Sequence, residues 1–192
     1  MASQSRQPAE PGRYMRQTMG LTRMGERILD KAEFYVRRGR CKPLLRLMKK
    51  HQYLFDPDHS NLIYEAMWRN RKMLQWLLMN GVKPDSPVAG YTPLMSAAAD
   101  GDLKAIELLL QFGANVNARN DENEVPLGYA CSWKQWPAAE LLIKNGADVN
   151  AIENEGKTHL DWLILSGETS GAALLRSYGA LTYQELESQK GM

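Results

Sequence analysis

Long hydrophobic runs are absent from this sequence, and cysteine is scarce. No stretch of 18 apolar residues occurs, which excludes a membrane-spanning helix. Two cysteines, Cys41 and Cys131, stand far apart in 192 residues, whereas a small secreted scaffold carries more of them in even clusters. This usage favours a reducing, cytoplasmic location, with Cys131 buried as a small apolar side chain. Residues 1–20 lack the apolar stretch of a secretory signal, although their arginines and scarcity of acids leave an organelle transit peptide as an alternative.

Recognisable catalytic patterns are missing too. The three histidines are His51, His59 and His159. None stands in a His-x-Glu spacing and no Cys-x-x-Cys pair occurs, so we expect no zinc site and a structural role for each histidine. The sequence contains no Gly-x-x-x-x-Gly-Lys phosphate loop and no Gly-x-Ser-x-Gly nucleophile elbow. It therefore predicts a protein that is not an enzyme and holds no cofactor or metal, with an unrecognised active site as the alternative.

Charge is nearly balanced overall but unevenly distributed. Residues 1–80 hold 16 Lys/Arg against 7 Asp/Glu, and residues 81–192 hold 8 against 15, an asymmetry that can steer charged partners. The clustered basic residues are Arg37, Arg38, Arg40, Lys42, Arg46, Lys49 and Lys50. They support an alternative function, the binding of nucleic acid or an anionic surface. Against it, only Tyr35 and Tyr53 offer aromatic rings for base stacking nearby.

A period of about 33 residues organises most of the chain. Gly81, Gly113, Gly146 and Gly179 are separated by 32, 33 and 33 residues, and each follows a leucine-containing run at helical spacing. The clearest copy begins Gly90-Tyr91-Thr92-Pro93-Leu94 and ends Ala114-Asn115-Val116-Asn117-Ala118. A second copy runs from 123 to 151, and weaker copies lie on either side of these two.

This pattern resembles the ankyrin repeat, whose spacing G-x-T-P-L-x-x-A-A-x-x-G followed by L-L-L-x-x-G-A-x-V-N-A is matched nearly throughout by the clearest copy. The resemblance implies an all-α solenoid of about four helix-turn-helix repeats, because one unit cannot bury both of its faces alone. The repeats are expected at 57–86, 87–119, 120–152 and 153–182. We expect a flexible segment at 1–20, a helical capping unit at 21–56, and a tail at 183–192, with a last half-turn at 181–186.

Local signals predict where the helices begin and end. Thr92 is expected to cap the first helix of its repeat, with Pro93 in the first turn and Gly101 in a left-handed conformation after the last turn. Lys134 and Arg69 stand where two other repeats would carry that glycine. Either these side chains adopt a left-handed conformation, which costs about 1 kcal/mol, or the turn is reshaped.

The apolar pattern predicts the core. Leu103, Ile106, Leu109 and Leu110 are expected to form the inward stripe of one second helix. Val116 is expected to be the buried anchor of the loop that follows. Leu142 is expected to be a core residue of the central copy.

The resemblance also implies where a partner would bind. Ankyrin proteins contact their partners mainly through a concave face made of loop tips and the exposed side of each first helix, so we expect a monomer that binds another protein. The candidate contact residues are Trp68, Tyr91, Asp100, Phe112, Asp121, Glu122, Glu124, Trp133, Lys157 and Tyr178. Four large aromatic residues stand at positions where the core needs no apolar group: Trp68, Phe112, Trp133 and Tyr178. Exposed aromatic side chains are enriched in interface hot spots.

Two alternatives accompany this interpretation. In the first alternative, Trp68 and Trp133 cover neighbouring loops instead of binding a partner. In the second, Asn117 and Asn150 are modified, because the asparagine of such loops is a hydroxylation site in some members of the family. The acidic run at Asp121, Glu122 and Glu124 is expected to be solvated on the loop between repeats rather than to perform catalysis.

Overall fold

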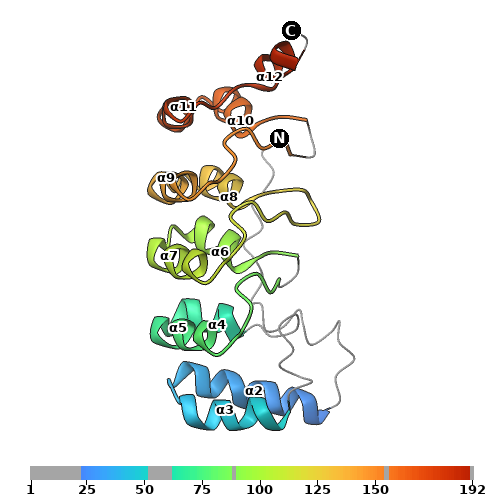
Figure 1. Cartoon of the computed structure of the whole chain (residues 1–192), viewed down its shortest axis with the longest axis vertical. Helices are drawn as coiled ribbons and strands as arrows, with labels where there is room; N and C mark the ends of the chain where they lie inside the picture. The colour runs from blue at the N-terminus through green and yellow to red at the C-terminus, as the bar shows by residue number, and fades with distance from the viewer. Residues whose placement is uncertain (1–22, 52–61, 88–89, 154–155, 191–192) are drawn as a thin grey trace. The chain divides into compact units, whose positions relative to one another are not determined.

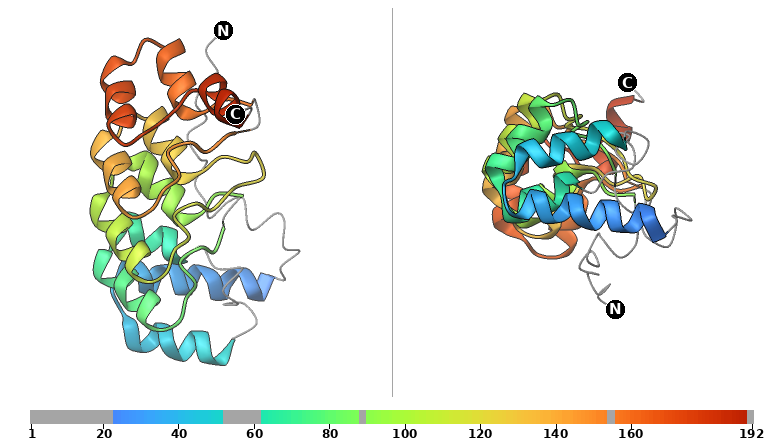
Figure 2. Two further views of the ribbon diagram at one scale, coloured as in Figure 1. Left: turned by 45° about the horizontal axis from the view of Figure 1, so that its top comes forward. Right: turned by 90° about the horizontal axis from the view of Figure 1, so that it is seen from below.

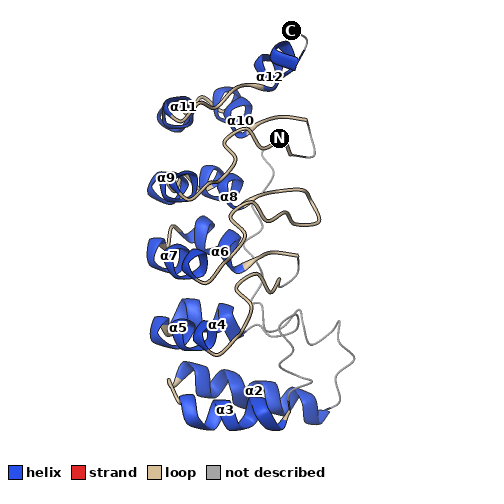
Figure 3. Ribbon diagram, in the orientation of Figure 1, coloured by secondary structure: helices blue, strands red, loops and turns tan. Residues whose placement is uncertain are grey.

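The chain forms two compact helical units, Met1–Gly90 and Tyr91–Met192. The computed structural model describes residues 23–51, 62–87, 90–153 and 156–190, with side chains described from residue 27 onward. These residues contain eleven helices, and an isolated β-bridge pairs Ile152 with Thr158 (Figure 3). The expectation of an all-α repeat array is confirmed.

The Met1–Gly90 unit contains four described helices. They are α2 (Arg23–Arg37), α3 (Cys41–Lys50), α4 (Leu62–Arg69) and α5 (Arg71–Met79). Helix α2 packs against α3 and α4, and α4 packs against α5. Ile28, Ala32 and Val36 are buried along one side of α2, as the helical spacing of its apolar residues predicts. His59, at the expected loop tip of the first repeat, lies outside the described residues.

The Tyr91–Met192 unit consists of helix pairs followed by one further helix. The elements are α6 (Pro93–Asp100), α7 (Leu103–Gln111), α8 (Pro126–Ser132), α9 (Trp136–Lys144), α10 (His159–Leu165), α11 (Thr169–Ser177) and α12 (Tyr183–Lys190). The first helices α6, α8 and α10 pack in sequence on one another, and the second helices α7, α9 and α11 do the same. Figures 1 and 2 show these two helical layers, with the loops between repeats projecting to one side of the first helices.

Threonine side chains begin two of the first helices. The Thr92 hydroxyl accepts a hydrogen bond from the Met95 N–H at 3.3 Å, and Pro93 occupies the first turn, where its missing N–H costs nothing. Thr158 and Asp161 form a reciprocal capping box at the start of α10. The Thr158 hydroxyl accepts from the Asp161 N–H at 3.4 Å, and the Asp161 carboxylate accepts from the Thr158 N–H at 2.9 Å. The predicted start of α6 at Thr92 and Pro93 is confirmed.

The backbone conformation differs between Lys134 and Arg69, the two residues that replace a glycine. Gly101, Lys134 and Gly167 are spaced by 33 residues and all have positive φ, with Lys134 at +56°. The Lys134 ammonium forms an ion pair with the Glu168 carboxylate, so its side chain gains a partner at a strained position. Arg69 has no positive φ; instead Asn70 is extended at φ −157° and caps α5 by accepting from the Met73 N–H at 3.2 Å. The turn is left-handed in one repeat and reshaped in the other.

The predicted stripe of α7 is partly wrong. Ile106 and Leu109 are fully buried, but Leu103 is 37% exposed and Leu110 is half-buried. Ala105 is the third buried residue of this helix. At 3.6 residues per turn, positions 105, 106 and 109 share an arc that is rotated away from 103 and 110. The positions of the leucines alone therefore do not identify which side of α7 is buried.

The prediction that Val116 is the buried anchor of the loop is also wrong. Val116 is only half-buried, whereas Ala114 is buried, as are its repeat equivalents Ala147 and Ala180. The Ala114 N–H donates to the Leu109 carbonyl at 2.9 Å, which keeps this alanine against the end of the helix. A valine two residues later already lies out on the loop.

The C-terminal tail contains more helix than expected. Where the sequence predicts a last half-turn, α12 extends over eight residues to Lys190. The Glu185 carboxylate accepts from the Thr182 N–H at 2.7 Å, and the Glu185 N–H donates to the Thr182 hydroxyl at 3.3 Å. Arg176 adds a two-pronged ion pair to the same carboxylate. These capping contacts explain why the helix begins here.

Candidate protein-binding face

The loops between repeats in the Tyr91–Met192 unit are tied to one another by asparagines. The Asn117 amide oxygen accepts from the Asp148 N–H at 2.9 Å, and its nitrogen donates to the Gly146 carbonyl at 3.0 Å. One repeat later, Asn150 accepts from the Leu181 N–H at 2.7 Å. The repeated bond holds successive loops in register. Modification of Asn117 or Asn150 stays a prediction, and these bonds are what it would alter.

The loop tip at 119–124 is held by internal bonds. The Arg119 guanidinium donates to the Ile152 and Asn123 carbonyls, both at 3.0 Å. The Asn120 amide oxygen accepts from the N–H groups of Glu122 and Glu124. Asp121 and Glu122 are exposed at this tip. The expectation that the acidic run is solvated is confirmed for Asp121 and Glu122 but wrong for Glu124, which is half-buried, and the tip presents negative charge on a fixed backbone.

Behind this tip, aromatic rings meet a carboxylate. The Tyr91 and Tyr129 rings pack edge to face, with centroids 5.8 Å apart. The Tyr129 hydroxyl donates a hydrogen bond to the Glu124 carboxylate, which also accepts from the Asn120 amide at 2.7 Å. Burial raises the pKa of the Tyr129 hydroxyl, and the neighbouring Glu124 raises it further. Tyr129 is therefore a donor fixed to Glu124, which in turn is oriented from two sides.

A second carboxylate lies deeper, beside a buried histidine. Glu153 Oε1 is 3.7 Å from Nδ1 of His159, whose side chain is 3% exposed. Burial raises the pKa of Glu153 to about 7, and the Glu124 charge adds to this rise. Burial lowers the pKa of His159 to about 4, so the imidazole is neutral near pH 7. A Cβ atom on Gly128 would come within 2.7 Å of the imidazole, which accounts for glycine inside α8.

Large exposed side chains follow the first helices of this unit. Trp133 is 39% exposed, Trp162 38% and Leu165 67%. Trp162 and Leu165 lie three residues apart in α10 and so share one side of that helix, and Trp133 directly follows the end of α8, four residues after Tyr129. We call Tyr129, Trp133, Trp162 and Leu165 the first-helix face. Because α8 packs beside α10, the two pairs belong to neighbouring repeats.

Trp162 is a residue that the sequence analysis missed. It stands 33 residues after Tyr129, so the repeat period could have placed it on the same face. The Lys157 ammonium lies over its ring, 4.4 Å from the centroid. Lys157, predicted at a loop tip, thus contacts the first-helix face.

Other predicted contact residues lie elsewhere. Phe112 and Tyr178 follow the second helices α7 and α11 and are half-buried, and the Tyr178 hydroxyl donates to Glu140 at 3.1 Å. They lie at the opposite end of the helix pairs from Trp133, which follows a first helix. Asp100 is exposed at the end of α6. Partial burial of its carboxyl raises its pKa, and the nearby Asp102 charge raises it further. The structure does not bring Phe112 or Tyr178 to the first-helix face.

Trp68 belongs to the other unit. Its side chain is 51% exposed immediately before the end of α4. Its role as a contact residue stays a prediction, as does the alternative that it covers a neighbouring loop.

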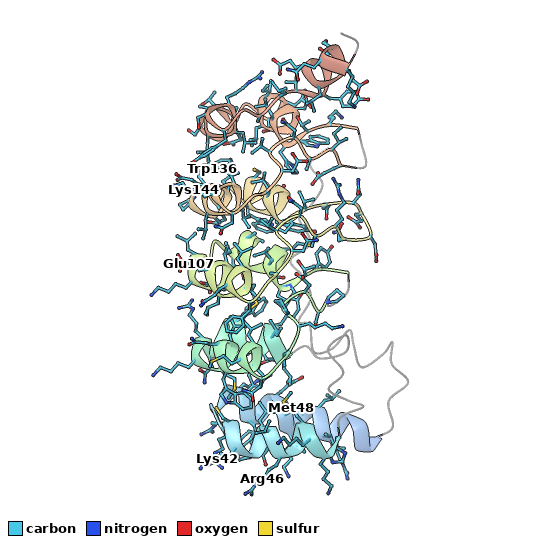
Figure 4. All side chains as sticks on the ribbon, viewed as in Figure 1. Lys42, Arg46, Met48, Glu107, Trp136 and Lys144 are labelled. Atoms are coloured by element: carbon cyan, nitrogen blue, oxygen red, sulfur yellow. The ribbon has the colours of Figure 1, made fainter. Side chains whose placement is uncertain are left out.

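The basic residues of the Met1–Gly90 unit divide into two groups. Arg37 pairs with Glu65 at 3.0 Å, and the Arg38 guanidinium lies 5.6 Å from the centroid of the Phe34 ring. The exposed basic residues of α3 are Lys42, Arg46, Lys49 and Lys50. Figure 4 shows Lys42 and Arg46 directed away from the other helices of their unit. Binding of an anionic partner by this stripe stays a prediction.

Neither a metal-binding cluster nor a membrane-spanning helix occurs among the described residues. Among the residues with described positions, no group of three or more His, Cys, Asp or Glu side chains is arranged to hold a metal ion. In the same part of the chain, every helix is too short or too polar to cross a membrane.

Comparison with known proteins identifies the repeats. A family model for ankyrin repeats, comprising three copies, matches residues 62–153. Alpha-latrocrustotoxin-Lt1a from Latrodectus tredecimguttatus is 36% identical over 79 residues, which are 40% of this chain and 6% of the toxin. The similarity thus spans a small part of a much longer protein. Ankyrin repeats are generally protein–protein interaction modules and are typically non-catalytic. The chain therefore contains ankyrin repeats, at residues 62–153.

Proposed function

We propose that the chain is a non-catalytic adaptor that binds a partner protein through the first-helix face and the adjoining loop tips of its Tyr91–Met192 unit. The observation that carries this proposal is the exposure of Trp133, Trp162 and Leu165 on neighbouring first helices. Large aromatic side chains that face solvent contribute little to a core but dominate the binding energy of many interfaces. We further propose that the protein acts as a cytoplasmic monomer.

The backbone around this face is suited to binding without rearrangement. Asn117 and Asn150 link successive loops, and Arg119 fixes the acidic tip to the next loop. Preorganised contact groups lose less conformational freedom on association. The carboxylate of Glu124 is already occupied by Tyr129 and Asn120, so we assign it to orienting the face rather than to catalysis.

A double variant tests the proposal. Trp133→Ala with Trp162→Ala removes two exposed rings, and surface substitutions usually change stability by about 0.5 kcal/mol or less. We expect the melting temperature to stay nearly unchanged, while proteins captured from the native host by the wild-type chain are lost. Interface anchors of this kind contribute about 2 kcal/mol or more to binding.

Ile164→Ala is the matched control. Ile164 is 52% exposed on the same helix as Trp162 but two residues away, so it points to another side. The control should retain the captured proteins. Equal loss in both variants, or retention in both, would contradict the assignment of the face, and early melting of the double variant would place the tryptophans in the core.

The basic stripe of α3 supports a second candidate function, binding of an anionic polymer. Lys42, Arg46, Lys49 and Lys50 are exposed together on one helix. Binding to random RNA with a steep dependence on salt concentration would favour this candidate. The stripe offers phosphate contacts without a neighbouring exposed ring on α3, so the protein-binding function is the better supported one.

A further inference from the structure

We propose that the partner segment is basic, and that one of its lysine or arginine side chains takes the place of Lys157 over the Trp162 ring. This inference rests on the proposed function and specifies the chemistry of the partner. It is carried by a contact within the chain itself, supported by the distribution of charge around it.

The contact shows which chemistry the Trp162 ring accepts. The Lys157 ammonium lies 4.4 Å from the ring centroid, within the range of a cation–π interaction, and the tryptophan remains 38% exposed. The Lys157 carbonyl accepts from the Glu153 N–H at 3.2 Å, so the backbone is anchored while the long side chain can turn aside. Lys157 is therefore an internal occupant of a site that a partner's cation can fill.

Net charge favours a cation from outside. Residues 91–192 contain 14 Asp/Glu and 7 Lys/Arg. Most of these basic side chains already contact groups of this unit: Arg119 donates to Ile152, Lys134 pairs with Glu168, Lys144 with Glu140, Arg176 with Glu185 and Lys190 with Glu187. In contrast, Asp121 and Glu122 extend into solvent at the neighbouring tip. A basic segment crossing from this tip to Trp162 would meet carboxylates before it meets the ring.

Lys157 would have different roles in binding an acidic and a basic partner segment. An acidic segment would use Lys157 as a positive contact, so removing the ammonium would weaken binding. A basic segment competes with Lys157, so removing the ammonium would strengthen binding. Lys157→Met distinguishes these cases because methionine keeps an unbranched, flexible side chain that can rest on the ring without charge.

Selection from a random peptide library displayed on phage, with the full chain as bait, provides the probe. We expect selected peptides to be enriched in lysine and arginine and their binding to weaken as salt is added. For a selected peptide synthesised with a fluorescent label, Lys157→Met should tighten binding roughly threefold or more, and Trp162→Ala should weaken it roughly tenfold. Trp162→Phe, which keeps a smaller ring, should give an intermediate affinity, and circular dichroism of each variant confirms that it is folded.

The outcomes separate the inference from the proposed function. Selected peptides that are acidic or uncharged, yet still depend on Trp162, would overturn the basic partner and leave the binding face in place. Weaker binding of a basic peptide by Lys157→Met would also overturn the exchange with Lys157. No selected peptide, or peptides indifferent to both Trp133 and Trp162, would overturn the inference and the proposed function together.

Discussion

Glu153 and His159 should give this protein a pair of opposing pH dependences that cancel in the wild type. Their side chains lie 3.7 Å apart beneath the acidic tip, and burial affects both pKa values. The pKa of Glu153 rises from 4.5 to about 7. The pKa of His159 falls from 6.5 to about 4. Both groups therefore favour their neutral forms in the folded protein.

The signs follow from which state binds the proton. Between about pH 4.5 and 7 the folded state keeps the Glu153 proton that the unfolded state has lost, so stability falls as pH rises. Between about pH 6.5 and 4 the unfolded state takes up a proton on His159 that the folded state refuses, so stability falls as pH drops. Where the two windows overlap, the slopes oppose each other, at up to about 1.4 kcal/mol per pH unit each.

Glu153→Gln should expose the histidine slope. The variant lacks the glutamate titration, so its stability relative to the wild type should increase by up to about 3 kcal/mol as pH rises from 4.5 to 7. Solvent reaches part of the side chain, which is 19% exposed, so we expect about 1–2 kcal/mol. Urea unfolding followed by circular dichroism at a series of pH values measures this difference.

Glu107→Gln is the control, since Glu107 is an exposed carboxylate on α7 (Figure 4). Its stability relative to the wild type should not show the rise with pH that is expected for Glu153→Gln. If the Glu153→Gln difference is equally flat, or falls as pH rises, then Glu153 is not held in its neutral form and the described environment of this carboxylate is wrong.

Three further changes probe other parts of the chain. Leu142→Ala empties a fully buried position in α9 and should lower the free energy of unfolding by about 2–5 kcal/mol; an unchanged urea midpoint would contradict the repeat register. Lys134→Gly relieves a left-handed side chain and should raise stability by up to about 1 kcal/mol, less the small contribution of its surface ion pair, so a clear loss in thermal unfolding would contradict the strain argument. For the second candidate function, reversing the charges of Arg46, Lys49 and Lys50 should slow association with an anionic polymer more than it speeds dissociation, and equal association rates at low salt would reduce these residues to solvated surface.

The helix boundaries could be predicted because their causes are local. A threonine cap, a proline in the first turn and a glycine after the last turn each act within a few residues, and they recur at the repeat period. Even the departure at Lys134 could be anticipated, since its position in the repeat demands a left-handed residue whatever side chain it carries. The same local causes would have indicated α12, had the Thr182–Glu185 capping pair been recognised.

What could not be predicted depends on contacts between repeats. Glu153 and His159 are six residues apart, but Glu124, which adds to the pKa rise of Glu153, is supplied by the preceding loop. Likewise, the side of α7 that is buried depends on how this helix packs against α6 and α9. A sequence pattern gives the spacing of apolar residues, whereas the rotation of a short helix within its layer depends on its neighbours.

Comparing copies within the chain separates core positions from the binding face. The inward position of the first helices is filled by Leu94, Leu127 and Leu160, all fully buried. Two residues further along each helix, the outward position is filled by Ser96, Tyr129 and Trp162, all at least partly exposed. The fold needs the same leucine in each copy, because each fills the same space between layers. The fold tolerates a serine at the outward position, so the core does not need a large ring there. The Tyr129 ring packs against Tyr91 and its hydroxyl donates to Glu124 within the unit, whereas the Trp162 ring remains 38% exposed. Binding of a partner would use such an exposed ring, so the variation at this position, rather than the repeat pattern itself, directs the search for a partner to the Trp162 side of the unit.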